Sequence, residues 1–147
     1  MANKKTANEE RRQSAEALLY QYQMLSAQME ALQKQASLIA EGMEEVSETI
    51  RTLEGMKSLK KGDEILVPLG SGTFTHGALT DVSGILVNIG ADVVRKKSVD
   101  DARGTLEKRK TEMESLSKRL AQDLTRVQTT MAALEPEIQA ALGQKKD

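Results

Sequence analysis

The residue types that most often carry chemistry are sparse in this chain. His76 is its single histidine, cysteine is absent, and the carboxylates are spread through segments rich in helix-forming residues. A structural zinc site needs four ligands, and a nucleophilic triad needs a histidine between an acid and a nucleophile. His76 lies in a threonine-rich run without a nearby acidic pair. We therefore expect no catalytic residues, no metal site, no cofactor and no enzymatic activity.

Phosphate and nucleic-acid binding are also poorly supported. Gly70-Ser71-Gly72 lacks the Lys-Ser/Thr that a phosphate-binding loop places at the start of the next helix, so a turn is expected there. The basic run Arg95–Lys97 is short and precedes acidic residues, and the net charge is −1. The sequence therefore indicates no nucleic-acid partner.

The composition favours a soluble protein. No apolar run approaches the roughly 20 residues of a membrane-spanning helix. Residues Met1–Ser14 are polar and mixed in charge, unlike a signal peptide. We therefore expect a cytoplasmic protein with no membrane partner.

The elements that would have to position any site are dominated by one long apolar stripe. Its members recur at alternating steps of four and three residues, the spacing of a coiled coil. They are Leu18, Tyr22, Leu25, Met29, Leu32, Ala36, Ile39, Met43, Val46, Ile50 and Leu53. We expect a helix that opens near Thr6 or Asn8, where Thr6-Ala7-Asn8-Glu9 has the form of a capping box, and ends at about Leu59. The first segment is therefore residues 1–60.

Residues 61–97 change character, with short β-type runs separated by turn residues. The runs are Glu64–Leu69, Thr73–Leu79, Ile85–Ile89 and Val93–Arg95. They predict two small hairpins, with Pro68 at an edge or strand end. So short a segment buries too little apolar surface to be stable alone, which predicts completion of the sheet by other subunits.

Residues 98–147 are expected to form a second helix, with Ser98 as its N-cap. Its apolar stripe skips position 109, where Arg109 replaces an apolar residue, and an extra four-residue step at Leu116, Leu120 and Leu124 predicts local unwinding. Pro136 is expected to kink the helix or end its ordered part. The stripe comprises Ala102, Leu106, Met113, Leu116, Leu120, Leu124, Val127, Met131, Leu134, Ile138 and Leu142.

The two helices are expected to pair with each other in antiparallel orientation. Leu18 lies 44 residues before Gly62, and Leu142 lies 44 residues after Ser98, so Leu18 should meet the neighbourhood of Leu142. The positions that flank the first stripe carry few opposite charges, although parallel zippers use such charges to select partners. The predicted fold class is α+β, a long antiparallel coiled-coil hairpin with two central β-hairpins.

The central segment resembles a known family. The runs ILVPLGSGTF at Ile65–Phe74 and ILVNIGADVVRKK at Ile85–Lys97, between two long helices, resemble the prefoldin α subunit of archaeal type. The resemblance covers residues from about 10 to 142. It implies a heterohexamer of two α and four prefoldin β subunits, in which the hairpins assemble into a β-barrel platform.

The resemblance also implies a function. Such complexes are ATP-independent chaperones that bind unfolded client proteins at the coiled-coil tips, prevent aggregation and deliver the clients to a group II chaperonin. The tip residues would be Leu18, Leu19, Tyr22, Leu134, Ile138 and Leu142. The oligomerisation residues would be Ile65, Val67, Leu69, Phe74, Leu79, Ile85, Val87, Ile89 and Val93.

Two alternatives remain open at the level of the sequence. One is a filament-forming relative of the α subunit, because strand edges can support closed rings or open growth. The other is a coiled-coil scaffold or tether without clients. In the apolar residues at the arm ends, the seam of the coiled coil and a client surface are both plausible roles.

Overall fold

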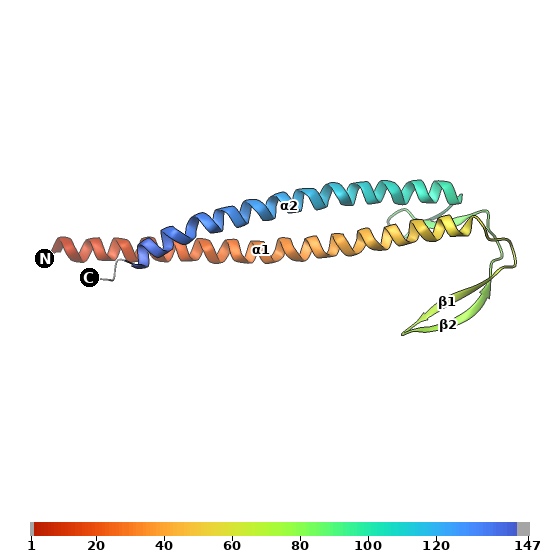
Figure 1. The fold of residues 1–147 in the computed structure, drawn as a ribbon, viewed down its shortest axis with the longest axis horizontal. Coiled ribbons are helices and arrows are strands. Elements are labelled where there is room, and N and C mark those ends of the chain that lie inside the picture. The colour runs from red at the N-terminus through yellow and green to blue at the C-terminus, as the bar shows by residue number, and fades with distance from the viewer. Residues whose placement is uncertain (1, 144–147) are drawn as a thin grey trace. The chain divides into compact units, whose positions relative to one another are not determined.

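The computed structural model describes residues 2–143 as two long helices separated by four short strands (Figure 1). The elements are α1 (Ala2–Met56), β1 (Glu64–Gly70), β2 (Thr73–Ala78), β3 (Ile85–Asn88), β4 (Val94–Lys97) and α2 (Val99–Gly143). This order confirms the predicted helix, double hairpin and helix. Residues 144–147, the end of the predicted second helix, and Met1 lie outside the described residues. The chain divides into two compact units, residues 1–40 with 115–147 and residues 41–114.

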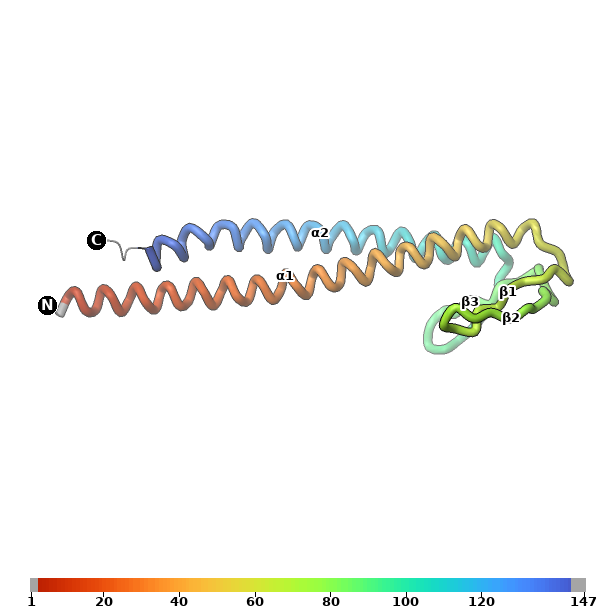
Figure 2. Tube along the Cα trace, turned by 60° about the horizontal axis from the view of Figure 1, so that its bottom comes forward, coloured from red at the N-terminus to blue at the C-terminus, as the bar shows by residue number. Residues whose placement is uncertain are grey.

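Within each unit, α1 and α2 lie side by side in opposite directions (Figure 2). In the first unit, Tyr22 Oη donates a hydrogen bond to Glu135 Oε1 at 3.2 Å. In the second unit, the Met113 side chain covers Gly42, and Leu53 packs in one cluster with Ala102. In an antiparallel pair the residue numbers of facing positions have a nearly constant sum. The sum is 157 for Tyr22 and Glu135 and 155 for the other two pairs, so the predicted antiparallel register is confirmed. It places Leu18 opposite roughly residue 138, about one helical turn from the predicted Leu142.

The predicted stripe of α1 forms its contact face. Each of its eleven residues, from Leu18 to Leu53, is buried or half-buried, and Leu53 is only 4% exposed. The residues between them are mostly exposed. The sequence therefore predicted this helix face correctly.

The contact face of α2 differs from the predicted stripe at two points. Leu116 is 36% exposed while the adjacent Ser117 is half-buried, and Leu142 is 55% exposed while Ala141 is half-buried. From Met113 to Ala141 the covered positions keep alternating steps of four and three residues, so the extra step at Leu116–Leu124 was predicted at the wrong place. The irregular step falls earlier. Two four-residue steps follow each other there, from Ala102 to Leu106 and from Leu106 to half-buried Lys110. Because α1 keeps an unbroken repeat, its partner helix has to keep the same period along the shared seam.

The helix ends only partly follow the sequence signals. Thr6 lies inside α1 and its Oγ1 donates to the Asn3 carbonyl at 3.3 Å, so the predicted capping box is wrong. Ser98 caps α2 as predicted, since Ser98 Oγ accepts a hydrogen bond from the Asp101 amide at 3.1 Å. Pro136 lies inside α2, which continues to Gly143. Neither helix of the described chain carries a stretch long and apolar enough to cross a membrane.

The strands form two separate two-stranded antiparallel sheets, β1–β2 and β3–β4, which confirms the two predicted hairpins. In the first sheet Leu66 pairs with His76, and in the second Val87 pairs with Arg95. The fourth strand covers Val94–Lys97 and not the predicted Val93–Arg95, because the turn before it extends through Val93. Each sheet has two strands within residues 2–143, so every strand there has one edge without a neighbouring strand.

Candidate functional site

The β1–β2 hairpin exposes apolar side chains on both faces. Cross-strand pairing places Leu66, Pro68 and Phe74 on one face, where Leu66 is 62% and Phe74 59% exposed. The opposite face carries Ile65 and Val67, whose side chains lie close to Gly77 on the neighbouring strand. A β-carbon at Gly77 would meet Val67 Cγ2 at 3.2 Å, so glycine allows this close cover. The hairpin therefore offers two apolar surfaces and no buried one.

A bulge and a tight turn close this hairpin. The register shifts between Pro68 and Gly70, which leaves Leu69 67% exposed. Ser71 and Gly72 both have positive φ, at 48° and 74°, and Thr73 Oγ1 donates to the Gly70 carbonyl at 2.6 Å. This confirms the turn predicted at Gly70-Ser71-Gly72.

The β3–β4 hairpin has one face anchored on the helices of its unit. Val87 is 8% exposed and packs in one cluster with Leu53 of α1 and Ala102 of α2. Arg109 Nη2 also donates to the Asn88 carbonyl at 2.6 Å, which ties the end of β3 to α2. Arg109, which interrupts the predicted stripe of α2, therefore holds the end of β3, while half-buried Lys110 takes the covered position. The inner face of this hairpin is therefore part of the chain's own core.

The other face of the β3–β4 hairpin is open. Leu86 is 72% and Val94 56% exposed, and both lie on the face opposite Val87. Ile89 and Val93, in the connecting turn, are 43% and 52% exposed. This hairpin thus offers one apolar surface where β1–β2 offers two.

An ion pair fixes the segment between the two hairpins to β4. Lys96 Nζ lies 2.6 Å from Asp81 Oδ2, and Ser83 donates to Asp81 through both its amide and its hydroxyl. The lysine ammonium, followed by the serine donors, holds the pKa of the Asp81 carboxyl well below its ordinary value of 3.8. The Lys96 side chain also fills the space beside Gly84, where any β-carbon would collide with it.

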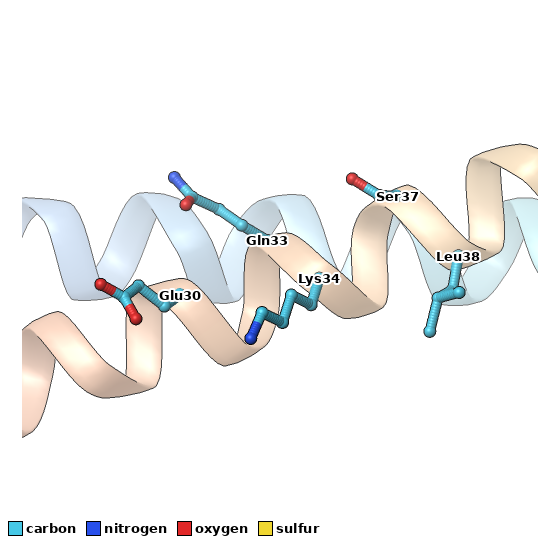
Figure 3. A pocket seen from close by; sticks show the side chains of 5 residues that line it. All are labelled: Glu30, Gln33, Lys34, Ser37 and Leu38. Atoms are coloured by element: carbon cyan, nitrogen blue, oxygen red, sulfur yellow. The ribbon is translucent and has the colours of Figure 1, made fainter.

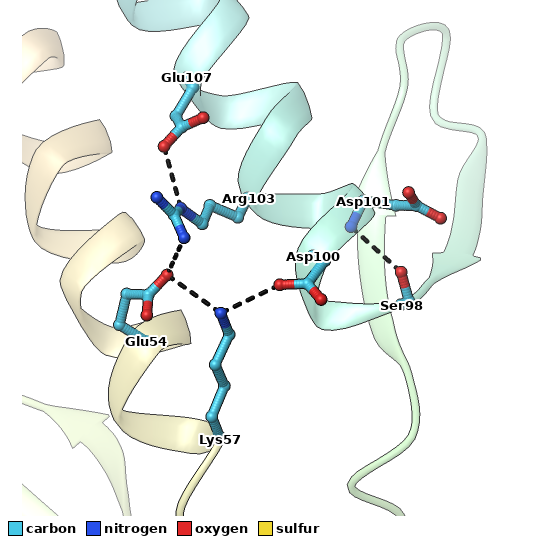
Figure 4. A network of polar contacts seen from close by, with 7 residues as sticks. All are labelled: Glu54, Lys57, Ser98, Asp100, Asp101, Arg103 and Glu107. Carbon is cyan, nitrogen blue, oxygen red and sulfur yellow. Dashed lines mark hydrogen bonds and ion pairs between the residues drawn. The ribbon is translucent and has the colours of Figure 1, made fainter.

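A network of charged side chains joins the end of α1 to the start of α2 (Figure 4). Glu54 lies at its centre and pairs with both Lys57, at 3.3 Å, and Arg103. Lys57 also pairs with Asp100 at 3.0 Å, and Arg103 with Glu107 at 2.9 Å. The hydrogen bond to Asp100 is the largest cause of the raised pKa of Lys57, and Glu107 is the largest cause for Arg103. These groups are about 40% exposed or more, so the network orients the helix ends and adds little stability.

The structure divides the predicted oligomerisation residues into three groups. Val67, Leu69, Phe74, Ile89 and Val93 are exposed, and Ile65, Leu79 and Ile85 are half-buried. Val87 is buried in the chain's own core and offers no surface. Leu66, Leu86 and Val94 are also exposed apolar strand residues that the predicted set does not include, although strand alternation places each of them on a face with other apolar residues.

The predicted tip residues all belong to the first unit but differ in exposure. Leu19 and Leu142 are 38% and 55% exposed, whereas Leu134 is 7% exposed. Leu18, Tyr22 and Ile138 are half-buried. Tyr22 donates to Glu135, and this acceptor is the largest cause of the raised pKa of Tyr22. Four of the six predicted residues thus take part in helix pairing in this structure.

The single histidine does not lie in a cluster of acidic residues in the described part of the chain. His76 is exposed on β2 opposite Leu66. Within residues 2–143, no three His, Cys, Asp or Glu side chains lie close enough to hold a metal ion. The features that stand out in this structure are exposed apolar strands and helix ends.

Two antiparallel helices that carry a pair of β-hairpins between them define a helical-hairpin protein with a double β-hairpin insert. The chain belongs to the prefoldin family, because the family model described as "Prefoldin subunit" matches residues 25–144. This is a family of chaperone subunits without enzymatic activity.

Curated relatives place the chain near the α-type members. It is 42% identical over 94 residues to "Prefoldin subunit alpha 1" of Thermococcus kodakarensis, a match that covers 64% of each chain. It is 34% identical over 126 residues to "Prefoldin subunit alpha" of Thermofilum pendens, with 86% of this chain and 98% of that protein covered. The aligned region thus spans less than two thirds of the Thermococcus protein and nearly all of the Thermofilum protein.

A solved structure has the same fold. A chain of the filamentous PFD from Methanocaldococcus jannaschii superposes with a TM-score of 0.69 at 19% identity, covering 79% of this chain and 96% of that one. The similarity supports the arrangement of two helices and two hairpins.

Proposed function

We propose that this chain is the α-type subunit of an ATP-independent chaperone that binds unfolded proteins, prevents their aggregation and delivers them to a group II chaperonin. Its partners would be prefoldin β subunits, in a hexamer of two α and four β chains. The observation that carries the proposal is the set of exposed apolar strand residues in a chain of the prefoldin family. Apolar surface of this kind on a small sheet is typical of an interaction site.

Assembly would use the strand edges and apolar faces of both hairpins. Leu66 and Phe74 on β1–β2, and Leu86 and Val94 on β3–β4, are each more than half exposed in the single chain. Pairing with hairpins of other subunits would bury these side chains and satisfy the free edges, as closure of a β-barrel does. We therefore add these residues to the predicted oligomerisation surface.

Client binding would take place at the arm end. Leu19 and Leu142 are available in the folded arm, while Leu18, Tyr22, Leu134 and Ile138 would contribute after the last turns separate. Apolar contacts contribute about 25 cal/mol per Å² buried, so one arm would bind weakly and several arms would provide avidity. Such binding would require no nucleotide.

The test is suppression of the aggregation of a chemically unfolded client by the assembled complex. Replacing Leu19, Ile138 and Leu142 with Ser should raise the concentration of complex needed to suppress aggregation by about tenfold or more. The mass of the complex should stay the same. Leu116→Ser is the matched control, because Leu116 is as exposed as Leu19 and lies away from the arm end. A double variant of Leu19 and Leu142 alone avoids disturbing the seam at Ile138. If both tip variants suppress aggregation as well as the wild type does, the arm end is not the client-binding site.

A filament or scaffold is the alternative function. The free edges of two-stranded sheets would support open growth as well as ring closure. Assemblies of variable length formed by this chain alone would favour that alternative.

A further inference from the structure

The outer face of α1 carries a second apolar stripe that the pairing of the two helices does not use. Tyr20, Met24 and Leu38 are 66%, 55% and 67% exposed, in contrast to the covered stripe that begins at Leu18. Ala17 precedes them, and Ala27 and Ala31 lie between Met24 and Leu38. Together with Lys34 these residues follow steps of three and four, the same repeat as the covered face. A repeat that keeps its phase for three heptads matches a long, straight helix.

This stripe is specific to α1. The equivalent outward positions of α2 in the same unit carry Ser115, Arg119, Gln122, Arg126 and Thr129, followed by Ala133, Pro136 and Ala140. None of these is a large apolar side chain, and the first five are polar or charged, as expected for a helix face that stays in water. The apolar residues on α1 therefore do not reflect a general property of the arm.

A shallow depression lies at the Leu38 end of the stripe (Figure 3). It has a volume of about 510 Å³ and is lined by Glu30, Gln33, Lys34, Ser37 and Leu38. Figure 3 shows Lys34 and Leu38 projecting to one side of α1, away from Gln33 and Ser37. The depression offers space for an apolar side chain beside an exposed leucine.

The two borders of the stripe differ in charge. One border carries Glu16, Gln23, Glu30 and Ser37, and the other carries the amides Gln21, Gln28 and Gln35. A helix that lies on the stripe would meet two carboxylates along one flank and neutral hydrogen-bonding groups along the other, with Lys34 as the one cation within the stripe. Lysine or arginine on one flank of that helix would complement this pattern.

The stripe has few large side chains, so a partner helix bound to it would dissociate quickly. Three exposed side chains separated by alanines bury less than the roughly 800 Å² per partner of a stable protein interface. Met24 also adapts its shape readily to different neighbours. The stripe therefore suits transient partners better than a permanent subunit contact.

We propose that residues 17–38 of α1 form a docking stripe for basic amphipathic helices that form within partly folded client proteins. The proposal rests on the proposed chaperone function, and it adds a surface outside the predicted tips together with a class of client segment. Apolar side chains of the client helix contact Tyr20, Met24 and Leu38, and its basic flank faces Glu16 and Glu30.

The experiment uses the full-length chain in its purified complex and an 18-residue fluorescent peptide of leucine and lysine with helical amphipathic spacing. The wild-type complex should bind this peptide at least about tenfold more tightly than a scrambled peptide of the same composition or a leucine–glutamate version. Replacing Tyr20, Met24 and Leu38 with Gln should remove this preference, because glutamine keeps helix propensity and removes the apolar contact. Leu116→Gln, on α2, is the control and should bind as the wild type does. Circular dichroism should show unchanged helix content in both variants.

Two outcomes would overturn the docking stripe. One is equal peptide binding by the triple variant and the wild type, and the other is equal binding of the helical and scrambled peptides. Aggregation assays separate this failure from failure of the chaperone function. If the wild-type complex suppresses client aggregation and the triple variant suppresses it equally, the stripe is wrong and the chaperone function stands. If the wild-type complex suppresses nothing, the chaperone function itself fails.

Discussion

The two β-hairpins are similar in size and connectivity but differ in what supports them. β3–β4 rests on its own chain, because Val87 is buried against Leu53 and Ala102. The β1–β2 hairpin has apolar side chains on both faces, with Leu66 on one and Val67 on the other. An isolated two-stranded hairpin is marginally stable in water, so only β3–β4 has its stabilising surface within the chain. In the proposed assembly, β1–β2 would therefore depend more strongly than β3–β4 on contacts with other subunits.

The largest expected effect comes from charging the face of β1–β2. Leu66→Asp combined with Phe74→Asp should raise the dissociation constant of the complex by at least about 100-fold, because each carboxylate would lose its water on assembly. Sedimentation velocity would measure the shift to smaller species. The same two changes should leave the helix content of the single chain intact, since both side chains are exposed there.

Removing the anchor of β3–β4 should act within the chain. Val87→Ala should destabilise the folded unit by about 1–3 kcal/mol, because it removes buried methyl groups and leaves a cavity. Hydrogen exchange would show faster amide exchange in residues 85–97. Val67→Ala, measured in the unassembled chain, is the matched control and should have a small effect because Val67 is 38% exposed. Similar effects of the two changes would contradict the contrast between the hairpins.

The charged network at the helix ends should matter less. Arg103→Gln removes the partner of Glu54 and Glu107, and it should accelerate amide exchange at the start of α2 by less than about fivefold. Salt at about 1 M should remove most of the difference, since these groups are exposed. Arg126→Gln is the control, because Arg126 pairs with Asp123 of its own helix. A larger effect that persists in high salt would mean that Arg103 acts through packing.

Acid should produce the smallest effect, through Asp81. The folded-state pKa of this carboxyl lies below its ordinary value of 3.8, so its contribution is present above about pH 4 and is lost as the pH falls through the lowered pKa. Amide exchange of β4 should rise in this range by less than about twofold in the wild type, after correction for the intrinsic pH dependence of exchange. Asp81→Asn should remove the transition. Identical pH profiles for both proteins would assign acid sensitivity to other carboxylates.

Regular periodicity explains what the sequence predicted well. The stripe of α1 is unbroken, so its contact face and its antiparallel partner were predictable from residue spacing. The face of α2 was less so, because Ser117 and Ala141 occupy the seam while the larger Leu116 and Leu142 lie beside it. The phase of a helix in a pair depends on its partner's repeat as well as on its own residue types.

The strand residues illustrate a second limit. Alternation predicts which residues share a face, but it does not tell which face packs on the helices. Val87 was therefore predicted as an assembly residue, although Leu53 and Ala102 cover it. The tip residues show the same ambiguity, since seam and client surface need similar apolar side chains.

The most direct test of the central claim is the native mass and subunit content of the complex that contains this chain, tagged and isolated from its own cells. The account predicts a six-subunit particle with two copies of this chain and four copies of a second, shorter coiled-coil subunit. A single chain without partners, or a series of homo-oligomers of variable length without a second subunit, would contradict it.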